Sequence, residues 1–452
     1  MQKASLPKGT RDFSTDVMRK RKQIIATIED VYIKYGFDPI ETPAMENLST
    51  LTGKYGEEGD TLLFKILNSG DYLAKADRDA IATGDSSKLI PTIANKGLRY
   101  DLTVPFARFV VQNQSSINFP FRRYQMQPVW RADRPQKGRY REFWQCDADV
   151  IGTTSLLCEA DFIKIYDEVF RALGLNTYQL KLNNRKILEA ISETIGFTGT
   201  FTDLTVAIDK LDKIGWDGVA EELSTKGVTN NALERLKELL VVTPFDRDAI
   251  EALTDVLIDC PQKAAGIQEL STVLDFIEGY DANVSLDLTL ARGLDYYTGC
   301  IFEAIIPESG IGSVSGGGRY DNLTGIFGLQ DVSGVGISFG LDRIYDVMTK
   351  LDLFDDEALT NKVLFCHFDD AGLQYALPIC DLLRTKNIVA TVYPDRKKIN
   401  KQFDYANKSG YKWVAVIGSN EMEENSVQLK NMATGKQELV KISDIVRFIN
   451  EA

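Results

Sequence analysis

Apolar side chains after Ser14 follow the period of an α-helix. Ser14 is a favoured residue at a helix N-terminus, and Gly36 is of the type that ends helices. Between them the apolar positions recur three or four residues apart, which places them along one face; they are Val17, Ile24, Ile25, Ile28, Val31 and Tyr32. We therefore predict one amphipathic helix between Ser14 and Gly36.

Strand-like segments separated by turn residues dominate from residue 37 to residue 152. Few helical patterns lie between them, which is typical of an antiparallel sheet; they are FDPIETP, TLLFKILNSGDYLA, GLRYDLTV, FRRYQMQPVW and REFWQCDADVIG. From about residue 185 to residue 277 the pattern turns helical, and strand-like sequence returns with VSLDLTLARGLDYYTGCIFEAII. The predicted fold class is α+β, an antiparallel sheet interrupted by a helical insertion.

The acidic stretch LDLFDDEALT precedes a segment of different character. Strand-like VLFCHF, IVATVYP and WVAVIG alternate there with two helical patterns, which predicts a small α/β domain with a parallel or mixed sheet. Residues 361–452 carry 13 Lys and Arg against 11 Asp and Glu, a net charge of +2. Since the whole chain has a net charge of −13, the rest of the chain carries −15. The predicted division assigns 1–184 and 278–350 to the sheet domain, 185–277 to the insertion, 351–360 to a linker and 361–452 to the α/β domain.

Composition excludes several function classes. Because His367 is the one histidine, zinc sites and proton relays that need two imidazoles are excluded. The 6 cysteines include no CxxC pair, so we predict neither zinc nor disulfides but the reduced thiols of a cytoplasmic protein. No segment approaches the ~20 apolar residues that cross a bilayer, and no apolar signal segment opens the chain, so we expect no export and no membrane partner.

An arginine-rich segment stands out in this acidic chain. Residues 121–142 read FRRYQMQPVWRADRPQKGRYRE, two strand-like stretches around a turn with Pro and Gly. Arg131 and Arg139 can point into one cleft from opposite sides of such a hairpin, an arrangement suited to the phosphates of a polyphosphate or a nucleic acid. The alternative is a solvated hairpin whose charges only face water.

Three further segments carry weaker signals. The glycines of SVSGGGRYDNLTGIFG permit close approach of a ligand or a tight turn. Arg343 falls in the first turn of a helix expected near Leu341, where a positive charge opposes the helix dipole, so it either binds an anion or reaches solvent. In ARGLDYYTG, Tyr296 and Tyr297 either serve a site or pack in the core.

Taken in order, these segments resemble the class II aminoacyl-tRNA synthetases, and within them the histidine enzymes. The matching pieces are LPKGTRDF, FDPIETP with Pro43 as motif 1, RYDLTVPFARF, WRADRPQKGRYREFWQCDAD as motif 2, ARGLDYYTG and GVGISFGLDRI as motif 3. ARGLDYYTG is the most specific of them. The resemblance spans essentially the whole chain.

The resemblance implies a two-step reaction. Histidine attacks the α-phosphate of ATP to give histidyl-adenylate, and the histidyl group then passes to the 3′ end of tRNA(His). Arg131 and Arg343 match the ATP-binding arginines, Arg139 matches one near the γ-phosphate, and Arg292 matches one near the α-phosphate. Arg131, Arg292 and Arg343 are therefore the predicted catalytic residues, with Mg²⁺ on the ATP phosphates and no zinc.

The resemblance also implies the histidine-binding residues. Gln145 and Asp149 match positions that hold the α-ammonium group, and Asp101 with Tyr297 match positions that pair the two ring nitrogens. The full predicted set is Asp101, Thr103, Arg131, Gln145, Asp149, Arg292, Tyr296 and Tyr297. Some relatives carry Glu in place of Asp101 and Asp149.

The α/β domain resembles the family's anticodon-binding domain. Its residues 384–412 hold Arg384, Lys386, Arg396, Lys397, Lys398, Lys401, Lys408 and Lys412, a basic set suited to phosphates. The family also implies a homodimer through the segment around Pro43 and contact of the loop around Gln136 with the tRNA acceptor end. We expect His367 to be structural.

Two rival functions remain. One is the regulatory subunit of ATP phosphoribosyltransferase, which has the same fold but typically lacks the anticodon domain and an intact ARGLDYYTG. The other is an ATP-dependent ligase that does not use tRNA, against which the basic carboxy-terminal domain argues. Both features are present here, which favours the synthetase.

Overall fold

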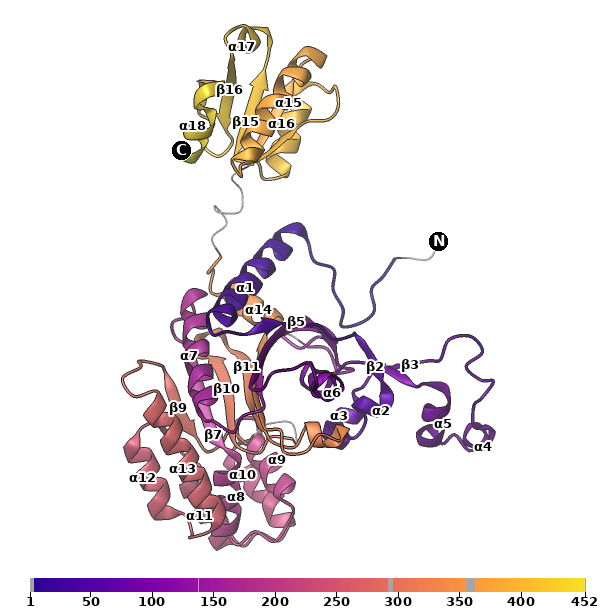
Figure 1. Cartoon of the computed structure of the whole chain (residues 1–452), viewed down its shortest axis with the longest axis vertical. Coiled ribbons are helices and arrows are strands. Elements are labelled where there is room, and N and C mark those ends of the chain that lie inside the picture. Colours follow the sequence, from indigo (N-terminus) through magenta and orange to yellow (C-terminus); the bar gives the residue numbers. More distant parts are fainter. Residues whose placement is uncertain (1–3, 137, 292–295, 355–361, 452) are drawn as a thin grey trace. The chain divides into compact units, whose positions relative to one another are not determined.

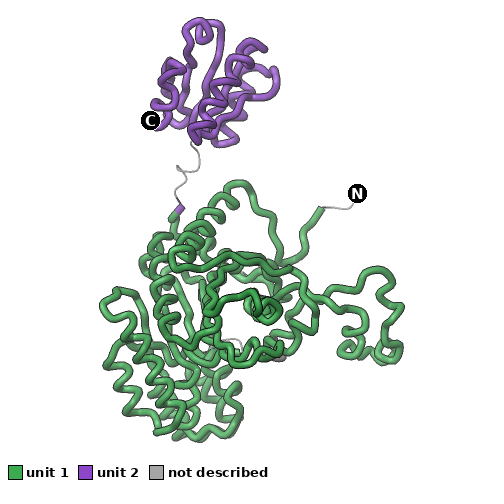
Figure 2. Tube along the Cα trace, in the orientation of Figure 1, with its two compact units in different colours: residues 1–353 green, residues 354–452 purple. Residues whose placement is uncertain are grey.

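The structure is a computed structural model that describes residues 4–136, 138–291, 296–354 and 362–451. The chain forms two compact units, residues 1–353 and 354–452 (Figure 2). Unit 1 holds a large sheet with helices on both faces, and unit 2 is a small α/β fold (Figure 1). No described helix is long and apolar enough to cross a bilayer. The predicted fold class is confirmed.

The central feature of unit 1 is, within the described residues, a 9-stranded sheet that is largely antiparallel. Two neighbour pairs in it, β1 with β5 and β7 with β9, run parallel. In spatial order the strands are β1 (Asp38–Pro39), β5 (Phe121–Trp130), β6 (Glu142–Ile151), β12 (Gly334–Gly340), β11 (Ile311–Tyr320), β10 (Cys300–Ile306), β7 (Gln179–Asn184), β9 (Val284–Asp287) and β8 (Val242–Pro244).

Helices α1 (Thr15–Lys34), α7 (Leu157–Ala172) and α14 (Leu341–Lys350) pack together on one face of this sheet. The predicted first helix is confirmed: the Ser14 hydroxyl accepts a hydrogen bond from Val17 N, and Gly36 follows the helix with φ +74°. Tyr32 of α1 donates from its hydroxyl to Cys146 O of β6 (2.8 Å). Because neighbouring residues of a strand face opposite ways, Gln145 and Asp147 face the other side.

Three predicted β segments are wrong over most of their length. TLLFKILNSGDYLA keeps only β3 (Lys65–Ile66), because the turn residues of NSGD end pairing, and FDPIETP keeps only the two residues of β1 at the sheet edge. GLRYDLTV contributes β4 (Lys96–Leu98) and then turns into α6 (Thr103–Asn113), because the Asp101 carboxylate accepts from Val104 N (3.2 Å) and caps that helix. β3 and β4 join β2 (Met45–Asn47) in a small separate sheet; short helices α2 (Leu48–Leu51), α3 (Gly56–Thr61), α4 (Arg78–Thr83) and α5 (Ser86–Ile93) lie nearby in the sequence.

Helices fill the segment between β7 and β9, as the periodicity predicts. They are α8 (Arg185–Thr194), α9 (Phe201–Asp209), α10 (Leu211–Thr225), α11 (Asn230–Leu239), α12 (Arg247–Val256) and α13 (Pro261–Phe276). The exception is the short edge strand β8, which returns to pair with β9. The helical segment is therefore joined to the sheet at its two ends by β7 and β9, and near its middle by β8.

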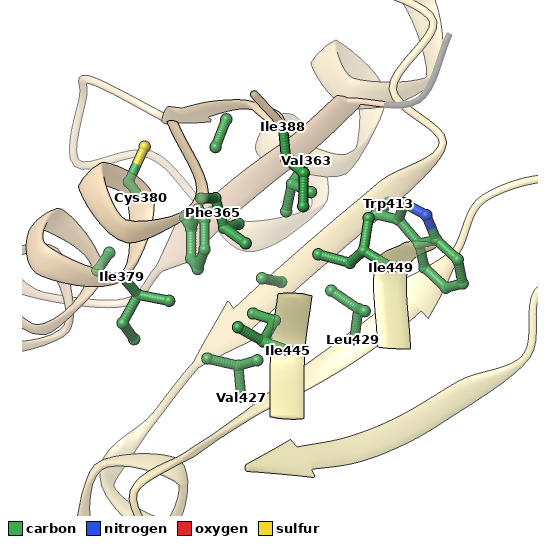
Figure 3. Close-up of a cluster of buried hydrophobic side chains, with 14 of the residues drawn as sticks. Val363, Phe365, Ile379, Cys380, Ile388, Trp413, Val427, Leu429, Ile445 and Ile449 are labelled. Atoms are coloured by element: carbon green, nitrogen blue, oxygen red, sulfur yellow. The ribbon is translucent and has the colours of Figure 1, made fainter. Parts of the chain in front are cut away.

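Unit 2 has its own apolar core, with Phe365, Trp413 and Ile445 inside it (Figure 3). His367 ends β13 and is buried, with Nδ1 3.0 Å from Asp369 O and Nε2 2.9 Å from Tyr393 O, contacts that suit a structural residue. The sheet is mixed, with β14 (Val389–Val392), β13 (Lys362–His367) and β15 (Trp413–Ile417) parallel, followed by antiparallel β16 (Ser426–Asn431) and β17 (Gln437–Lys441). The helices are α15 (Asp370–Thr385), α16 (Ile399–Lys408), α17 (Ser419–Glu423) and α18 (Ile445–Glu451).

Candidate active site

A cavity of about 490 Å³ opens over the large sheet, on the face opposite α1. Residues from β6, β11, β12, the β5–β6 hairpin, α14 and α10 line it. The cavity brings together most of the predicted site residues, which are Asp101, Thr103, Arg131, Arg139, Gln145, Tyr296, Tyr297 and Arg343. Arg292 lies outside the described residues, as does Lys137 of the arginine-rich hairpin.

The floor of the cavity is a set of polar rows that run across β5, β6 and β12. Gln145 pairs with Gln127 and Gly340, and Asp149, four positions on, pairs with Arg123 and Gly336. Since alternate residues of a strand share a face, all of these positions lie on the cavity side. Between the two rows stands a third, formed by Gln125, Asp147 and Ser338.

The glycines of SVSGGGRYDN lie in β11, so the tight-turn interpretation is wrong. Gly316, Gly317 and Gly318 do not have positive φ. A Cβ on Gly318 would lie 2.8 Å from Cys300 O, and one on Gly317 would run into Gly336 O, so the neighbouring strands leave no room for side chains. Gly316 and Gly317 line the cavity, where the bare backbone keeps the floor open to a ligand.

Among the described residues, three guanidinium groups line the cavity, those of Arg131, Arg139 and Arg343. The Arg131 guanidinium lies over the rings of Tyr100 and Phe143, 4.2 and 5.1 Å from their centres, and its Nε donates to Tyr100 O (3.1 Å). Arg343, in the first turn of α14, donates from Nε to Gly138 O (3.0 Å) and from Nη1 to Ser313 O. These contacts hold the Arg131 and Arg343 guanidinium groups in place in the lining of the cavity.

Arg139 reaches the cavity from the tip of the hairpin. It is held by a bidentate pair with Asp133, with Nε 2.9 Å and Nη2 2.8 Å from the two carboxylate oxygens. The solvated-hairpin alternative fits only part of this segment: Arg134 and Arg139 are exposed, whereas Arg123 is fully buried and Arg122 pairs with Asp161 (2.9 Å). The hairpin therefore presents arginine side chains in fixed positions.

Asp101 lies at the other side of the cavity and is almost completely buried. Its Oδ1 accepts from the Tyr55 hydroxyl (3.0 Å) as well as from the first turn of α6, and its Oδ2 accepts from the Tyr296 hydroxyl (3.3 Å). Burial raises the pKa of Asp101, and these donors together with Arg131 oppose that shift. Tyr297 packs edge-on against Tyr296, with ring centres 5.1 Å apart.

Asp149 does not appear among the described residues that line the cavity. It lies in the floor, 2.6 Å from Arg123 Nη2, and its Oδ1 accepts from the Tyr320 hydroxyl (2.6 Å). Burial raises the pKa of Asp149, and Arg123 opposes the shift. The neighbouring Asp147 is fully buried too, and desolvation raises the pKa of that carboxyl to about 7.

Sequence reasoning missed several lining or supporting residues. Tyr55 supports Asp101 from α3's N-cap position, and Phe143 forms one face of the Arg131 stack. The insertion contributes Asp209 and Lys213, and β10 contributes Glu303. Phe143 and Glu303 lie on predicted strands, at alternate positions that face the cavity, so the strand pattern could have indicated them. No pattern in the sequence indicates Tyr55, Asp209 or Lys213.

Metal and RNA sites have different support. Among the described residues, no group of three His, Cys, Asp or Glu side chains is placed to hold a metal. The basic residues of 384–412 are exposed except for Lys412, which is half-buried. Arg396 lies near Asp370 (3.3 Å) and Lys397 near Asp395 (3.1 Å), both as solvent-exposed pairs that a phosphate can displace.

The chain is similar to known proteins over nearly its whole length. A family model described as "Histidyl-tRNA synthetase" matches residues 79–344, and one described as "Anticodon binding domain" matches residues 359–452. A protein of Cytophaga hutchinsonii named histidine–tRNA ligase is 52% identical over 450 residues, 99% of each chain, and one of Porphyromonas gingivalis with the same name is 53% identical over 97% of each chain. The crystal structure of histidyl-tRNA synthetase from Nostoc sp. PCC 7120 superposes with a TM-score of 0.84 at 29% identity, covering 100% of each chain.

Proposed function

The chain belongs to the histidyl-tRNA synthetase family and is a histidine–tRNA ligase, and we propose that the cavity over the large sheet is where it activates histidine with ATP. The observation that carries this proposal is the meeting of three fixed arginines with the buried Asp101 in one cavity. The full-length relatives favour the ligase over the regulatory subunit of ATP phosphoribosyltransferase.

The arginines suit adenylate formation. Attack of a carboxylate on the α-phosphate places negative charge on the phosphoryl oxygens, and fixed cations stabilise that charge in the transition state. We assign Arg131 and Arg343 to ATP, Arg139 to the γ-phosphate end, and Arg292 to the α-phosphate. The attacking carboxylate of histidine is ionised at neutral pH, so the reaction needs no enzyme base.

The opposite side of the cavity suits the amino acid. The Gln145 Oε1 is buried, and no hydrogen-bond donor among the described residues reaches it, so it can accept from the α-ammonium group. Asp149, two rows away on the same face of the sheet, supplies negative charge through the floor. Asp101 and Tyr297 are assigned to the ring nitrogens, with Thr103 and Tyr296 beside them, and a site built to pair both nitrogens rejects an analogue that lacks one by ~10⁴-fold.

Mg²⁺ would accompany the phosphates of ATP. This ion prefers oxygen ligands and usually combines one or two carboxylates with substrate phosphates. Asp209 and Glu303, both in the cavity lining, are carboxylates that fit such a role. When bound, the ion would neutralise part of the phosphate charge.

We assign tRNA(His) to two places. The exposed basic residues 384–412 of unit 2 suit the anticodon end, because a basic surface on an acidic chain is the mark of local phosphate contacts. The hairpin tip at Gln136, exposed and joined to Arg139 by a pair of backbone hydrogen bonds, suits the acceptor end. We propose a homodimer through the segment around Pro43, which light scattering of the full chain tests.

Histidine-dependent ATP–pyrophosphate exchange tests the proposed cavity chemistry. We expect exchange with histidine and none with the other amino acids. A Tyr297→Phe variant should keep the ring packing and lose selectivity against histidine analogues with one ring nitrogen replaced. Folded protein that shows no histidine-dependent exchange would overturn the proposal.

A further inference from the structure

The segment Leu6–Phe13, which we name the N-terminal strap, lies against the hairpin tip and against α14. Gly9 O accepts from Arg141 N (2.9 Å), and Arg141 Nη1 donates back to Lys8 O (3.4 Å). Gly9 has φ +88°, and a Cβ there would lie 2.8 Å from Arg141 Cγ and 2.9 Å from Pro135 Cγ. The strap therefore packs its bare backbone against both sides of the hairpin tip.

Arg11 is the strap residue that touches both elements at once. Its guanidinium lies over the Tyr140 ring, 3.2 Å from the centre, and its Nη2 pairs with Asp342 Oδ1. Tyr140 is a residue of the hairpin tip, next to Arg139, and Asp342 is in the first turn of α14, next to Arg343. Tyr140 and Asp342 both line the cavity.

Arg139 precedes Tyr140 in the sequence, and Arg343 follows Asp342. These two arginines are the ones assigned to the phosphates of ATP. Arg343 holds Gly138 O of the tip, and Arg139 holds Asp133, whose own backbone O accepts from Arg141 Nε (3.0 Å). A movement of the tip relative to α14 would thus separate Arg139 from Arg343. Arg11 connects the hairpin tip to α14 from outside the cavity, through Tyr140 and Asp342.

We propose that Arg11 is a positioning residue for ATP, which holds the hairpin tip and the first turn of α14 so that Arg139 and Arg343 face one polyphosphate chain. The proposal rests on the proposed function of the cavity. Fixed geometry matters here because a misplacement of about 1 Å can cost an enzyme ~10²-fold in rate. On the histidine side of the cavity, no hydrogen bond joins Asp101 to a described residue of the strap.

Arg11 is not the only counter-ion of Asp342, which makes the proposal testable. Asp342 is also paired with Arg21, 2.6 Å away and almost fully buried, and accepts from Trp144 N (2.9 Å). Arg11 is a quarter exposed, so its removal leaves Asp342 with a buried counter-ion. Arg11→Ala is therefore expected to fold, whereas Arg21→Ala leaves a core carboxylate poorly compensated.

The experiment compares Arg11→Ala, Arg11→Lys and Gly9→Ala with the wild type in ATP–pyrophosphate exchange. For Arg11→Ala we expect KM for ATP to rise about 10-fold or more with KM for histidine within about 2-fold, and Tm nearly unchanged. Arg11→Lys keeps the charge beside Asp342 but loses the planar group that stacks on Tyr140, so its KM for ATP should lie between those of the wild type and Arg11→Ala. Gly9→Ala should reproduce the ATP-selective change without altering Arg11 itself.

Arg19→Ala is the matched control, because the one ion pair of Arg19 with a described residue is that with the exposed Asp16 (2.8 Å) in the first turn of α1. An unchanged KM for ATP in Arg11→Ala would overturn the proposal. So would a parallel loss for both substrates with a lowered Tm, which marks a merely structural strap. Failure of the wild type to exchange with histidine would instead count against the proposed function of the cavity.

Discussion

Gly336 of β12 is paired directly with Asp149 of the neighbouring strand β6, and a side chain at Gly336 would occupy the place of the Asp149 carboxylate. The same carboxylate is held by Arg123 and by the Tyr320 hydroxyl. The absence of a Cβ on β12 thus allows a buried negative charge to sit beneath the cavity. The position of the Asp149 carboxylate on β6 thus depends on the glycine of the neighbouring strand β12.

We expect Gly336→Ala to push Asp149 away from Arg123 and to weaken histidine binding. Forcing an extra methyl group into a packed interior typically costs about 1–3 kcal/mol of stability. KM for histidine in pyrophosphate exchange should rise about 10-fold or more, at a temperature where the variant is folded. Gly312→Ala is the control, since a Cβ there meets nothing within 4 Å; equal effects of the two variants would contradict the role given to Gly336.

The pKa of Asp147, raised to about 7 by burial, predicts a dependence of stability on pH. In the unfolded chain this carboxyl titrates near 4, so between pH 4 and 7 the folded protein binds the extra proton. The contribution of Asp147 to the free energy of unfolding therefore falls as pH rises through this window and is constant above it. Asp149 adds to the shift, and Arg123 and Ser338 oppose it.

Asp147→Asn removes that titration. We expect the variant to gain about 1–4 kcal/mol relative to the wild type at pH 8 and little at pH 4, since each pKa unit corresponds to about 1.4 kcal/mol. Urea unfolding at both pH values measures the difference. Asp281→Asn, which alters a fully exposed carboxylate, should leave the pH dependence as it is. A gain that is the same at both pH values would show that the effect is not electrostatic.

Arg131 is expected to need its planar group and not only its charge. Arg131→Lys loses the stack between Tyr100 and Phe143 and the Nε bond to Tyr100 O. The rate of adenylate formation should fall about 10²-fold, the usual scale for a lost transition-state contact. Single-turnover kinetics measures this step, with Arg134→Lys as the control on the exposed side of the hairpin. A near-normal rate in Arg131→Lys would mean that a point charge suffices.

Unit 2 is expected to serve tRNA and not adenylate chemistry. It has a separate apolar core, and unit 1 ends at Leu353. Ending the chain after Leu353 should therefore lower tRNA charging at least 10²-fold while pyrophosphate exchange stays within a few-fold, because the phosphate contacts of RNA are a large part of its affinity. Similar losses in both assays would argue against this division of labour.

Elements with local signals could be predicted from the sequence. The limits of α1 follow from Ser14 and Gly36, and the order of strands and helices in unit 2 follows from its periodicity. Arg131, Arg139 and Arg343 each carried a signal of their own, a charge in an unusual place, and all three line the cavity. The resemblance supplied the remaining roles.

Elements set by distant partners could not be predicted. The turn from β4 into α6 is an exception, because Asp101 caps that helix through Val104 N only three residues on, a local signal in a segment whose composition favours strands. Tyr55 approaches Asp101 across 46 residues of chain, and Lys213 reaches the cavity from the insertion. Such contacts arise from the packing of whole elements, for which one sequence carries no local pattern.

The placement of His367 in β13 has a spectroscopic consequence. Residues 1–353 contain no histidine, so the ring of a bound substrate is the only imidazole in the unit that binds it. Its ring nitrogen resonances can be followed by NMR in that unit without signals from other imidazoles. The substrate thereby reports, through its own tautomer and charge, whether Asp101 and Tyr297 hydrogen-bond to it as proposed.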